Sequence, residues 1–156
     1  MDDLDIRRAT EQDLEGIVTL YRSAYRETSD LGFPRKAANA TAAGIKAGLD
    51  DDSIHVAILE GTIVGAVRSK ATSSARTKVS RLGIHPEWQG NGIGRLLLKH
   101  VETQSRQAGA ETAWLTTPEG HPYLADFYRD CGYERTSDNP LEYRDYDEIV
   151  MEKALG

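Results

Sequence analysis

"HPEWQGNGIGR", residues 85–95, carries three glycines within five positions. The residues just before it, "KVSRLGIHP" (78–86), are typical of a strand that a proline ends. Apolar side chains just after it recur at helical spacing, at Ile93, Leu96, Leu97 and Val101. A helix that starts directly after a glycine loop exposes unpaired N–H groups and the positive end of its dipole. The stretch therefore predicts a phosphate-binding site at the start of this helix.

Three phosphate-binding patterns can be compared with this loop. The dinucleotide fingerprint G-x-G-x-x-G is not matched, because the glycines are spaced as G-x-G-x-G. The nucleotide P-loop, G-x-x-x-x-G-K-[ST], does not occur in the chain. The third pattern, Q/R-x-x-G-x-G/A, is matched by residues 89–94 and is the pyrophosphate loop of the GNAT acyltransferase superfamily. By itself, so short a pattern also fits a glycine-rich turn that only caps a helix.

The resemblance to the GNAT superfamily extends over nearly the whole chain, in the family's order. Residues 81–102, "RLGIHPEWQGNGIGRLLLKHVE", resemble its central strand, loop and helix, and residues 127–134, "FYRDCGYE", resemble its second signature. Residues 6–17, "IRRATEQDLEGI", and 149–155, "IVMEKAL", resemble its opening and closing elements. The resemblance implies an α/β fold of the GNAT type: a mixed, mostly antiparallel central sheet with a splayed central strand and flanking helices. We expect one such domain over residues 1–156.

The patterning along the chain predicts the element order β-α-α-β-β-β-α-β-α-β-β. Thr10 is expected to cap the first helix, with Asp13 completing a variant of the capping box. A weak second helix is expected over Ala37–Leu49, and a hairpin turn at Glu60-Gly61. A short helix is expected over residues 121–133, with Gly132 just past its end.

The resemblance implies that acetyl-CoA is a co-substrate and that the acceptor is most often an amine. It assigns the CoA pyrophosphate to the N–H groups of Gln89, Gly90, Asn91, Gly92, Ile93, Gly94 and Arg95. The Arg95 side chain either adds a charge-assisted contact to phosphate or stays solvated. The splayed strand would pair with the pantetheine arm through Leu82, Gly83 and Ile84. A backbone N–H in this strand would also polarise the thioester carbonyl.

Tyr128 matches the superfamily tyrosine that protonates the departing CoA thiolate, a task that a hydroxyl can perform. The alternative for Tyr128 is simple packing beside Phe127. His121 stands where many members of the superfamily have an asparagine that contacts the pantetheine arm. Because it lies seven residues before Tyr128, about two helical turns, the two side chains can share a face. His121 would keep the contact, serve in acid–base chemistry, or only open the helix.

The acceptor amine must lose a proton before it attacks, and the sequence does not place the base. Glu119, Asp147 and Glu148 are candidates, although each is more typical of a surface carboxylate. Cys131 has no neighbouring base and is expected to be a buried apolar side chain rather than a nucleophile. The resemblance implies direct transfer in a ternary complex, as is usual in the superfamily, and we expect no metal ion.

The composition limits the partners of the chain. A net charge of −6 over 156 residues argues against nucleic acid. No apolar run approaches the ~20 residues of a membrane helix, and the acidic first residues lack the pattern of a secretory signal. A single cysteine is compatible with a reducing compartment. We expect a cytoplasmic protein with neither a membrane nor a nucleic-acid partner.

The sequence leaves the acceptor and the assembly open. The acceptor pocket is expected to involve Ser29–Leu49 and Asn139–Asp147, and the acidic last twenty residues weakly favour a cationic acceptor. A homodimer is compatible with the resemblance, since many members dimerise. Two alternatives to an active enzyme remain. One is a catalytically silent CoA-binding sensor or interaction domain, and the other is a nucleotide-binding module that prefers ATP or NAD.

Overall fold

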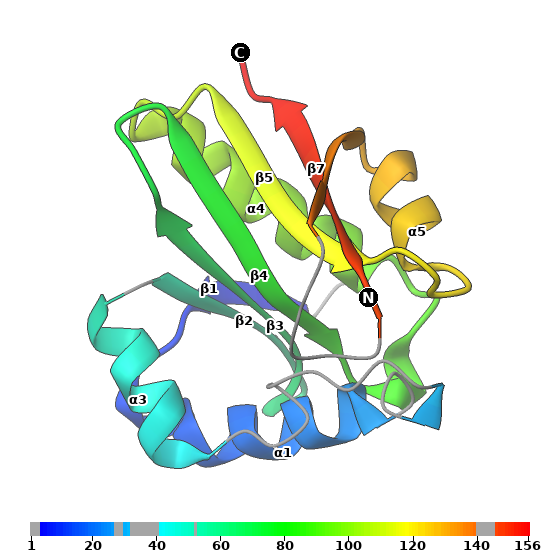
Figure 1. Ribbon diagram of the computed structural model, residues 1–156. Coiled ribbons are helices and arrows are strands. Elements are labelled where there is room, and N and C mark those ends of the chain that lie inside the picture. The colour runs from blue at the N-terminus through cyan, green and yellow to red at the C-terminus, as the bar shows by residue number, and fades with distance from the viewer. Residues whose placement is uncertain (1–3, 27–29, 32–40, 52, 140–145) are drawn as a thin grey trace.

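Seven strands form one sheet in the order β1-β2-β3-β4-β5-β7-β6, with helices packed against it (Figure 1). The computed structural model describes residues 4–26, 30–31, 41–51, 53–139 and 146–156. Its helices and strands are β1 (Asp5–Arg8), α1 (Leu14–Ala24), α3 (Ala42–Asp51), β2 (Ser53–Leu59), β3 (Thr62–Ala71), β4 (Arg76–Ile84), α4 (Ile93–Gln107), β5 (Thr112–Pro118), α5 (Leu124–Asp130), β6 (Glu134–Asn139) and β7 (Glu148–Ala154). All strand pairs are antiparallel except β4 with β5. The predicted mixed, mostly antiparallel sheet is confirmed.

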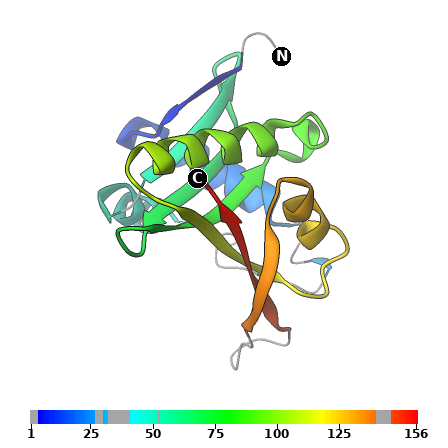
Figure 2. The same cartoon turned by 90° about the horizontal axis from the view of Figure 1, so that it is seen from above.

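Alternating residues build two separate cores, one on each face of the sheet. On β2, Val56 packs with α1 and α3, whereas its neighbour Ala57 packs with α4, as the alternation of side chains along a strand requires. Figures 1 and 2 show α1 and α3 on one side of the sheet and α4 on the other. In the described part of the chain, no helix is long and apolar enough to cross a membrane.

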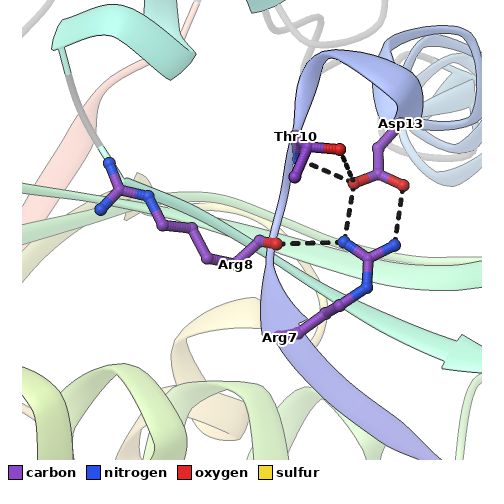
Figure 3. A network of polar contacts seen from close by, with 4 residues as sticks. All are labelled: Arg7, Arg8, Thr10 and Asp13. Carbon is purple, nitrogen blue, oxygen red and sulfur yellow. Dashed lines mark hydrogen bonds and ion pairs between the residues drawn. The ribbon is translucent and has the colours of Figure 1, made fainter.

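A polar network fixes the start of α1 (Figure 3). The Asp13 carboxylate accepts a 2.8 Å hydrogen bond from the backbone N–H of Thr10 and two from the Arg7 guanidinium, at 2.8 and 3.0 Å. The hydrogen bonds from Arg7 lower the pKa of Asp13, although burial opposes this shift. The expected capping box is present, around a 3₁₀ turn at Glu11–Asp13. Arg7 additionally ties this helix start to β1, which the sequence pattern did not indicate.

Two helices have bounds that differ from the prediction. The second helix, expected over Ala37–Leu49, is α3 and continues to Asp51, while residues 37–40 lie outside the described residues. The helix expected over residues 121–133 spans only Leu124–Asp130. Its late start has a local cause, because a residue that precedes a proline, as His121 does, disfavours helical backbone. Gly132 follows with a φ of 100°, as expected just past a helix end.

His55 makes the stability of the fold sensitive to acid. It lies on β2 with 3% of its surface exposed, and its ring centroid is 4.8 Å from that of His100 on α4. Burial, and then the charges of His100 and Arg8, lower the pKa of His55 from 6.5 to about 4, although a hydrogen bond with Gln104 opposes the shift. The unfolded chain therefore takes up this proton first as the pH falls.

Neutral His55 contributes to the free energy of unfolding. We expect this contribution to be fully present above pH 6.5 and to be lost as the pH falls towards 4. The expected loss is about 2–3 kcal/mol in the free energy of unfolding, measured by urea unfolding between pH 4 and 7. His55→Leu should remove this part of the pH dependence, and His85→Gln, in the loop after β4, should retain it. An unchanged slope in His55→Leu would contradict the prediction.

Candidate active site

β4 and β5 run parallel and separate toward their carboxyl ends (Figure 1). Their paired residues end at Lys78 and Trp114, so that residues 80–84 of β4 have no partner on β5. Within β4, Arg81 adopts a left-handed φ of 51°, and the register with β3 shifts at this point. Such a shift is a β-bulge, which adds a residue to one strand and turns it. The splayed central strand predicted from the sequence is therefore present, with a bulge where it begins.

The loop after β4 leads into the amino-terminal end of α4. A 3₁₀ turn at Pro86–Trp88 is followed by Gly90 and Gly92, with φ values of 82° and 81°, which glycine adopts without strain. The Asn91 side-chain amide donates to the carbonyl oxygens of Trp88 and Gln89 at 3.0 and 3.4 Å and thereby stabilises the loop. Because the first N–H groups of a helix have no partner within it, the end of this loop can receive an anion.

A cleft of about 420 Å³ lies where the two strands separate. It is lined by β4, β5, the glycine loop, the ends of α1 and α4 that meet it, and α5. Most of the predicted site residues line it: Leu82, Gly83, Ile84, Gln89, Gly90, Gly92, Ile93, Gly94, Arg95 and Tyr128. Asn91 shapes the loop but does not line the cleft, and neither does His121.

The bulge gives β4 two different faces at the cleft. Val79 and Leu82 lie three residues apart, yet both pack with the α4 core, because the bulge inserts an extra residue between them. Gly83 faces α1 instead, since a Cβ there would lie 3.2 Å from ring atoms of Tyr21 and Tyr25. The Tyr25 hydroxyl donates a 2.5 Å hydrogen bond to the Leu82 carbonyl oxygen. The end of α1 is thus held directly against the strand at the cleft.

Tyr128 lies on α5 and borders the cleft. Its ring packs edge-on against Phe127, with centroids 5.2 Å apart, and against Tyr133 at 6.0 Å. The Tyr133 hydroxyl donates a 2.8 Å hydrogen bond to Glu102 inside the protein. Of the two tyrosines it is therefore Tyr128 that is placed to meet a molecule in the cleft. The role predicted for it in the chemistry stays a prediction.

His121 precedes α5, so the expectation that it shares a helical face with Tyr128 is wrong. The side chain is buried, and its Nδ1 accepts hydrogen bonds from the backbone N–H groups of Tyr123 and Leu124, both at 3.3 Å. Its ring also packs edge-on against Tyr123, with centroids 4.5 Å apart. His121 thus caps the start of α5. Its contact with a pantetheine arm stays a prediction.

None of the three candidate bases lines the cleft. Glu119 forms a 3.1 Å ion pair with Arg135, Glu148 is buried on β7, and Asp147 is exposed beside that strand. Among all the residues that the structure describes, no aspartate or glutamate lines the cleft. A carboxylate base for the acceptor amine is therefore not provided by this part of the chain.

Cys131 lies just past α5 and outside the cleft, half-buried. Burial raises the pKa of its thiol, which keeps the sulfur protonated and weakens it as a nucleophile. This agrees with the expectation that Cys131 packs rather than reacts. Within the described ranges, no group of three or more His, Cys, Asp and Glu side chains is placed to hold a metal ion.

The sequence analysis missed several residues of the cleft, among them Tyr25, Arg81 and Thr116. Arg81 directly precedes the segment predicted for the pantetheine arm, so its position in the strand was an available signal. Tyr25 at the end of α1 and Thr116 on β5 are brought to the cleft only by the pairing of distant elements, for which the sequence carries no local signal.

Comparison with known proteins agrees with this geometry. The model of the acetyltransferase (GNAT) family matches residues 14–133. The S-alkylcysteine N-acetyltransferase of Bacillus subtilis (strain 168) is 26% identical over 143 residues, 86% of this chain and 80% of that protein. The PaiA N-acetyltransferase of Thermoplasma acidophilum, solved in complex with coenzyme A, matches with a TM-score of 0.83 at 18% identity, over 97% of this chain and 98% of that chain. The ribosomal-protein-S18-alanine N-acetyltransferase of Escherichia coli has a TM-score of 0.80 at 16% identity, over 98% and 94%.

The separation of the parallel strands β4 and β5, together with the similarity of the whole fold to the two solved structures, defines an acetyltransferase fold. The chain belongs to the acetyltransferase (GNAT) family. The membership that residues 81–102 and 127–134 indicate is thereby confirmed.

Proposed function

We propose that this protein is an N-acetyltransferase that moves an acetyl group from acetyl-CoA to an amine. The observation that carries the proposal is the cleft between β4 and β5, which both the glycine loop and Tyr128 border. The names of the relatives agree with the reaction but differ in the acceptor, an S-alkylcysteine in one and an alanine of a ribosomal protein in another.

The residues of the cleft fit acetyl-CoA as the donor. The N–H groups of Gln89–Arg95 would bind its pyrophosphate. Arg95 donates one hydrogen bond to the Asp130 carbonyl oxygen at 3.1 Å, and its remaining guanidinium donors stay available for phosphate. The backbone of Leu82–Ile84, which has no partner on β5, would pair with the amides of the pantetheine arm.

In the proposed reaction the acceptor nitrogen attacks the thioester carbonyl carbon and the carbon–sulfur bond breaks. A backbone N–H of β4 stabilises the negative oxygen that forms on the way. The Tyr128 hydroxyl donates its proton to the departing thiolate and is reprotonated from solvent. The proton of the amine leaves to water, since no described aspartate or glutamate lines the cleft.

Parallel calorimetric titrations with acetyl-CoA, ATP and NAD, followed by thiol release on an amine panel, test this proposal. Selective binding of acetyl-CoA and thiol release that depends on an amine are the expected results. Binding without turnover on the panel would instead indicate the silent CoA-binding alternative. A preference for ATP or NAD would overturn the proposal.

We expect Gly92→Ala to weaken acetyl-CoA binding about tenfold. Gly92 precedes α4 with a φ of 81°, a left-handed backbone that costs an alanine about 1–2 kcal/mol. Relief of that strain would turn the loop N–H groups away from the phosphates. Calorimetry with acetyl-CoA measures the loss.

Gly109→Ala, at the other end of α4, is the matched control. Gly109 has a φ of 102°, and a Cβ at either glycine would meet nothing within 4 Å. Both variants should therefore lose similar stability in urea unfolding, and only Gly92→Ala should lose affinity. Equal acetyl-CoA affinities of the two variants would contradict the proposed role of the loop.

We also propose, from the sequence alone, that residues 1–156 form a single domain and that the protein is cytoplasmic. Homodimer formation and the lack of a membrane or nucleic-acid partner stay predictions. Size-exclusion chromatography with light scattering tests the dimer.

A further inference from the structure

Two arginines line the cleft, and they have different surroundings. Arg95 belongs to the first turn of α4, next to the glycine loop, and donates to the Asp130 carbonyl oxygen. Arg81 lies on β4 at the bulge, three residues before Ile84 and so further from the glycine loop. Arg81 is half-buried, and its guanidinium has no hydrogen bond or ion pair with any residue that the structure describes. The guanidinium donors of Arg81 are therefore available to an anion that enters the cleft.

Arg81 lines the cleft two residues before Gly83, which faces α1. Its charge acts on the hydroxyl of Tyr21, and so does the charge of Arg68 on the neighbouring strand. That hydroxyl is buried under α1 and has no hydrogen-bond partner among the described residues. Arg68 is paired across the sheet with Ser80, which also lines the cleft. Arg81 therefore brings a positive charge to the cleft that no described acidic residue at the cleft neutralises.

The backbone supports a specific role for Arg81. A φ of 51° is unusual for an arginine and persists only where the surrounding pairing holds it. The bulge lies at this residue, and beyond it Leu82 and Ile84 pack on the α4 side while Gly83 faces α1. Leu82–Ile84 and the glycine loop with Arg95 belong to the proposed donor site, so Arg81 is the charged lining residue left for the acceptor among those that the structure describes.

We propose that the acceptor is an amine that also carries a carboxylate, and that Arg81 binds this carboxylate. The inference rests on the proposed N-acetyltransferase function. The planar guanidinium can donate two parallel hydrogen bonds to a carboxylate. A nearby cation also disfavours the ammonium form of the acceptor. This helps the amine to lose its proton in a cleft where the described residues offer no carboxylate base.

The same charges disfavour the cationic acceptor that the acidic last twenty residues suggested. Asp138 of that stretch forms an ion pair with Arg135, and Glu152 forms one with Arg76 at 3.2 Å. Neither carboxylate lines the cleft. Asp138 and Glu152 thus neutralise other cations of the sheet, and neither compensates the positive charge of Arg81.

The test compares free α-amino acids with their carboxamides, which differ only in the carboxylate. Alanine, S-methylcysteine and phenylalanine, each with its carboxamide, are assayed by thiol release from acetyl-CoA. The wild-type protein should have the higher kcat/KM for the free acids. The amine of a carboxamide is less basic and loses its proton more easily, so that a preference for the acid cannot come from the amine.

Arg81→Gln should lower kcat/KM for the free acids about 10- to 100-fold, mostly through KM, and leave the carboxamides within about threefold. Glutamine keeps an unbranched stem, and Arg81→Lys, which keeps the charge without the planar fork, should lie between the two. Arg106→Gln removes an exposed arginine of α4 and should change neither substrate class. Unchanged acetyl-CoA affinity in calorimetry shows that each variant is folded.

The outcomes separate this inference from the proposed function. Acetylation of both members of each pair with equal kcat/KM, or a preference for carboxamides or for polyamines such as spermidine, overturns the inference and leaves the proposed function intact. A protein that transfers acetyl to no amine overturns both. The wild-type comparison needs no variant, so the acceptor class is decided even if Arg81→Gln does not fold, and Arg81→Lys then tests the role of this residue.

Discussion

Tyr128→Phe is expected to lower kcat about 10²- to 10⁴-fold, the range that a positioned general acid contributes, while acetyl-CoA affinity stays unchanged. The substitution removes only the hydroxyl, and the edge-on packing of the ring against Phe127 and Tyr133 remains. The departing thiolate would then have to take its proton from water. Thiol release at saturating acetyl-CoA measures kcat, and calorimetry measures the affinity.

Tyr133→Phe is the control for Tyr128→Phe, because it removes a hydroxyl from the same aromatic cluster. That hydroxyl donates to Glu102 and lies away from the cleft. We expect this variant to lose stability and to keep kcat within about threefold, because an unmade buried hydrogen bond affects folding rather than the reaction. If Tyr128→Phe also kept kcat within threefold, Tyr128 would be a packing residue and the proton would come from elsewhere.

Lys153→Met is expected to lower the free energy of unfolding by about 3 kcal/mol, the low end for breaking a buried ion pair. The Lys153 ammonium on β7 lies 2.8 Å from Glu102 Oε1 on α4 and also donates to the Cys131 carbonyl oxygen at 2.9 Å. The Glu102 side chain is only 10% exposed. Its carboxylate would keep only the hydrogen bond from Tyr133. Urea unfolding at pH 7 measures the change.

Two variants show whether the buried carboxylate is the cause. The double variant Glu102→Gln/Lys153→Met removes both charges and should recover part of the lost stability, since no unpaired charge stays buried. Lys99→Met removes an exposed lysine from α4 and should change stability by no more than about 0.5 kcal/mol. A loss below 1 kcal/mol in Lys153→Met would mean that water replaces the ammonium.

Local patterns were enough to predict most elements of the fold. The hairpin at Glu60-Gly61 is confirmed, and both residues have positive φ values, 52° and 80°, as tight two-residue turns between strands require. The apolar spacing that predicts α4 depends only on neighbouring residues. The start of α5 was misplaced because His121 stabilises it from outside the helix with its side chain, an arrangement that apolar periodicity does not reveal.

The part of the site that is formed by one contiguous motif could be predicted from the sequence. The part that is formed where distant elements of the chain meet could not. Residues 89–95 are a single stretch, so most of the predicted loop residues line the cleft. Arg81 was missed because its place depends on a bulge, and an arginine gives no sign in the sequence that its backbone will be left-handed. The absence of carboxylates from the described part of the cleft depends likewise on pairs such as Glu119 with Arg135, which form only in the folded chain.

The two faces of β4 have a consequence for how such a protein diversifies. Leu82 and Ile84 pack on the α4 side, whereas Gly83 faces α1. Substitutions at the end of α1 can therefore accumulate and reshape one side of the cleft without displacing the glycine loop. During evolution, the ligand that meets the α1 side of the cleft can change in this way, while the glycine loop on the other side of the bulge is retained.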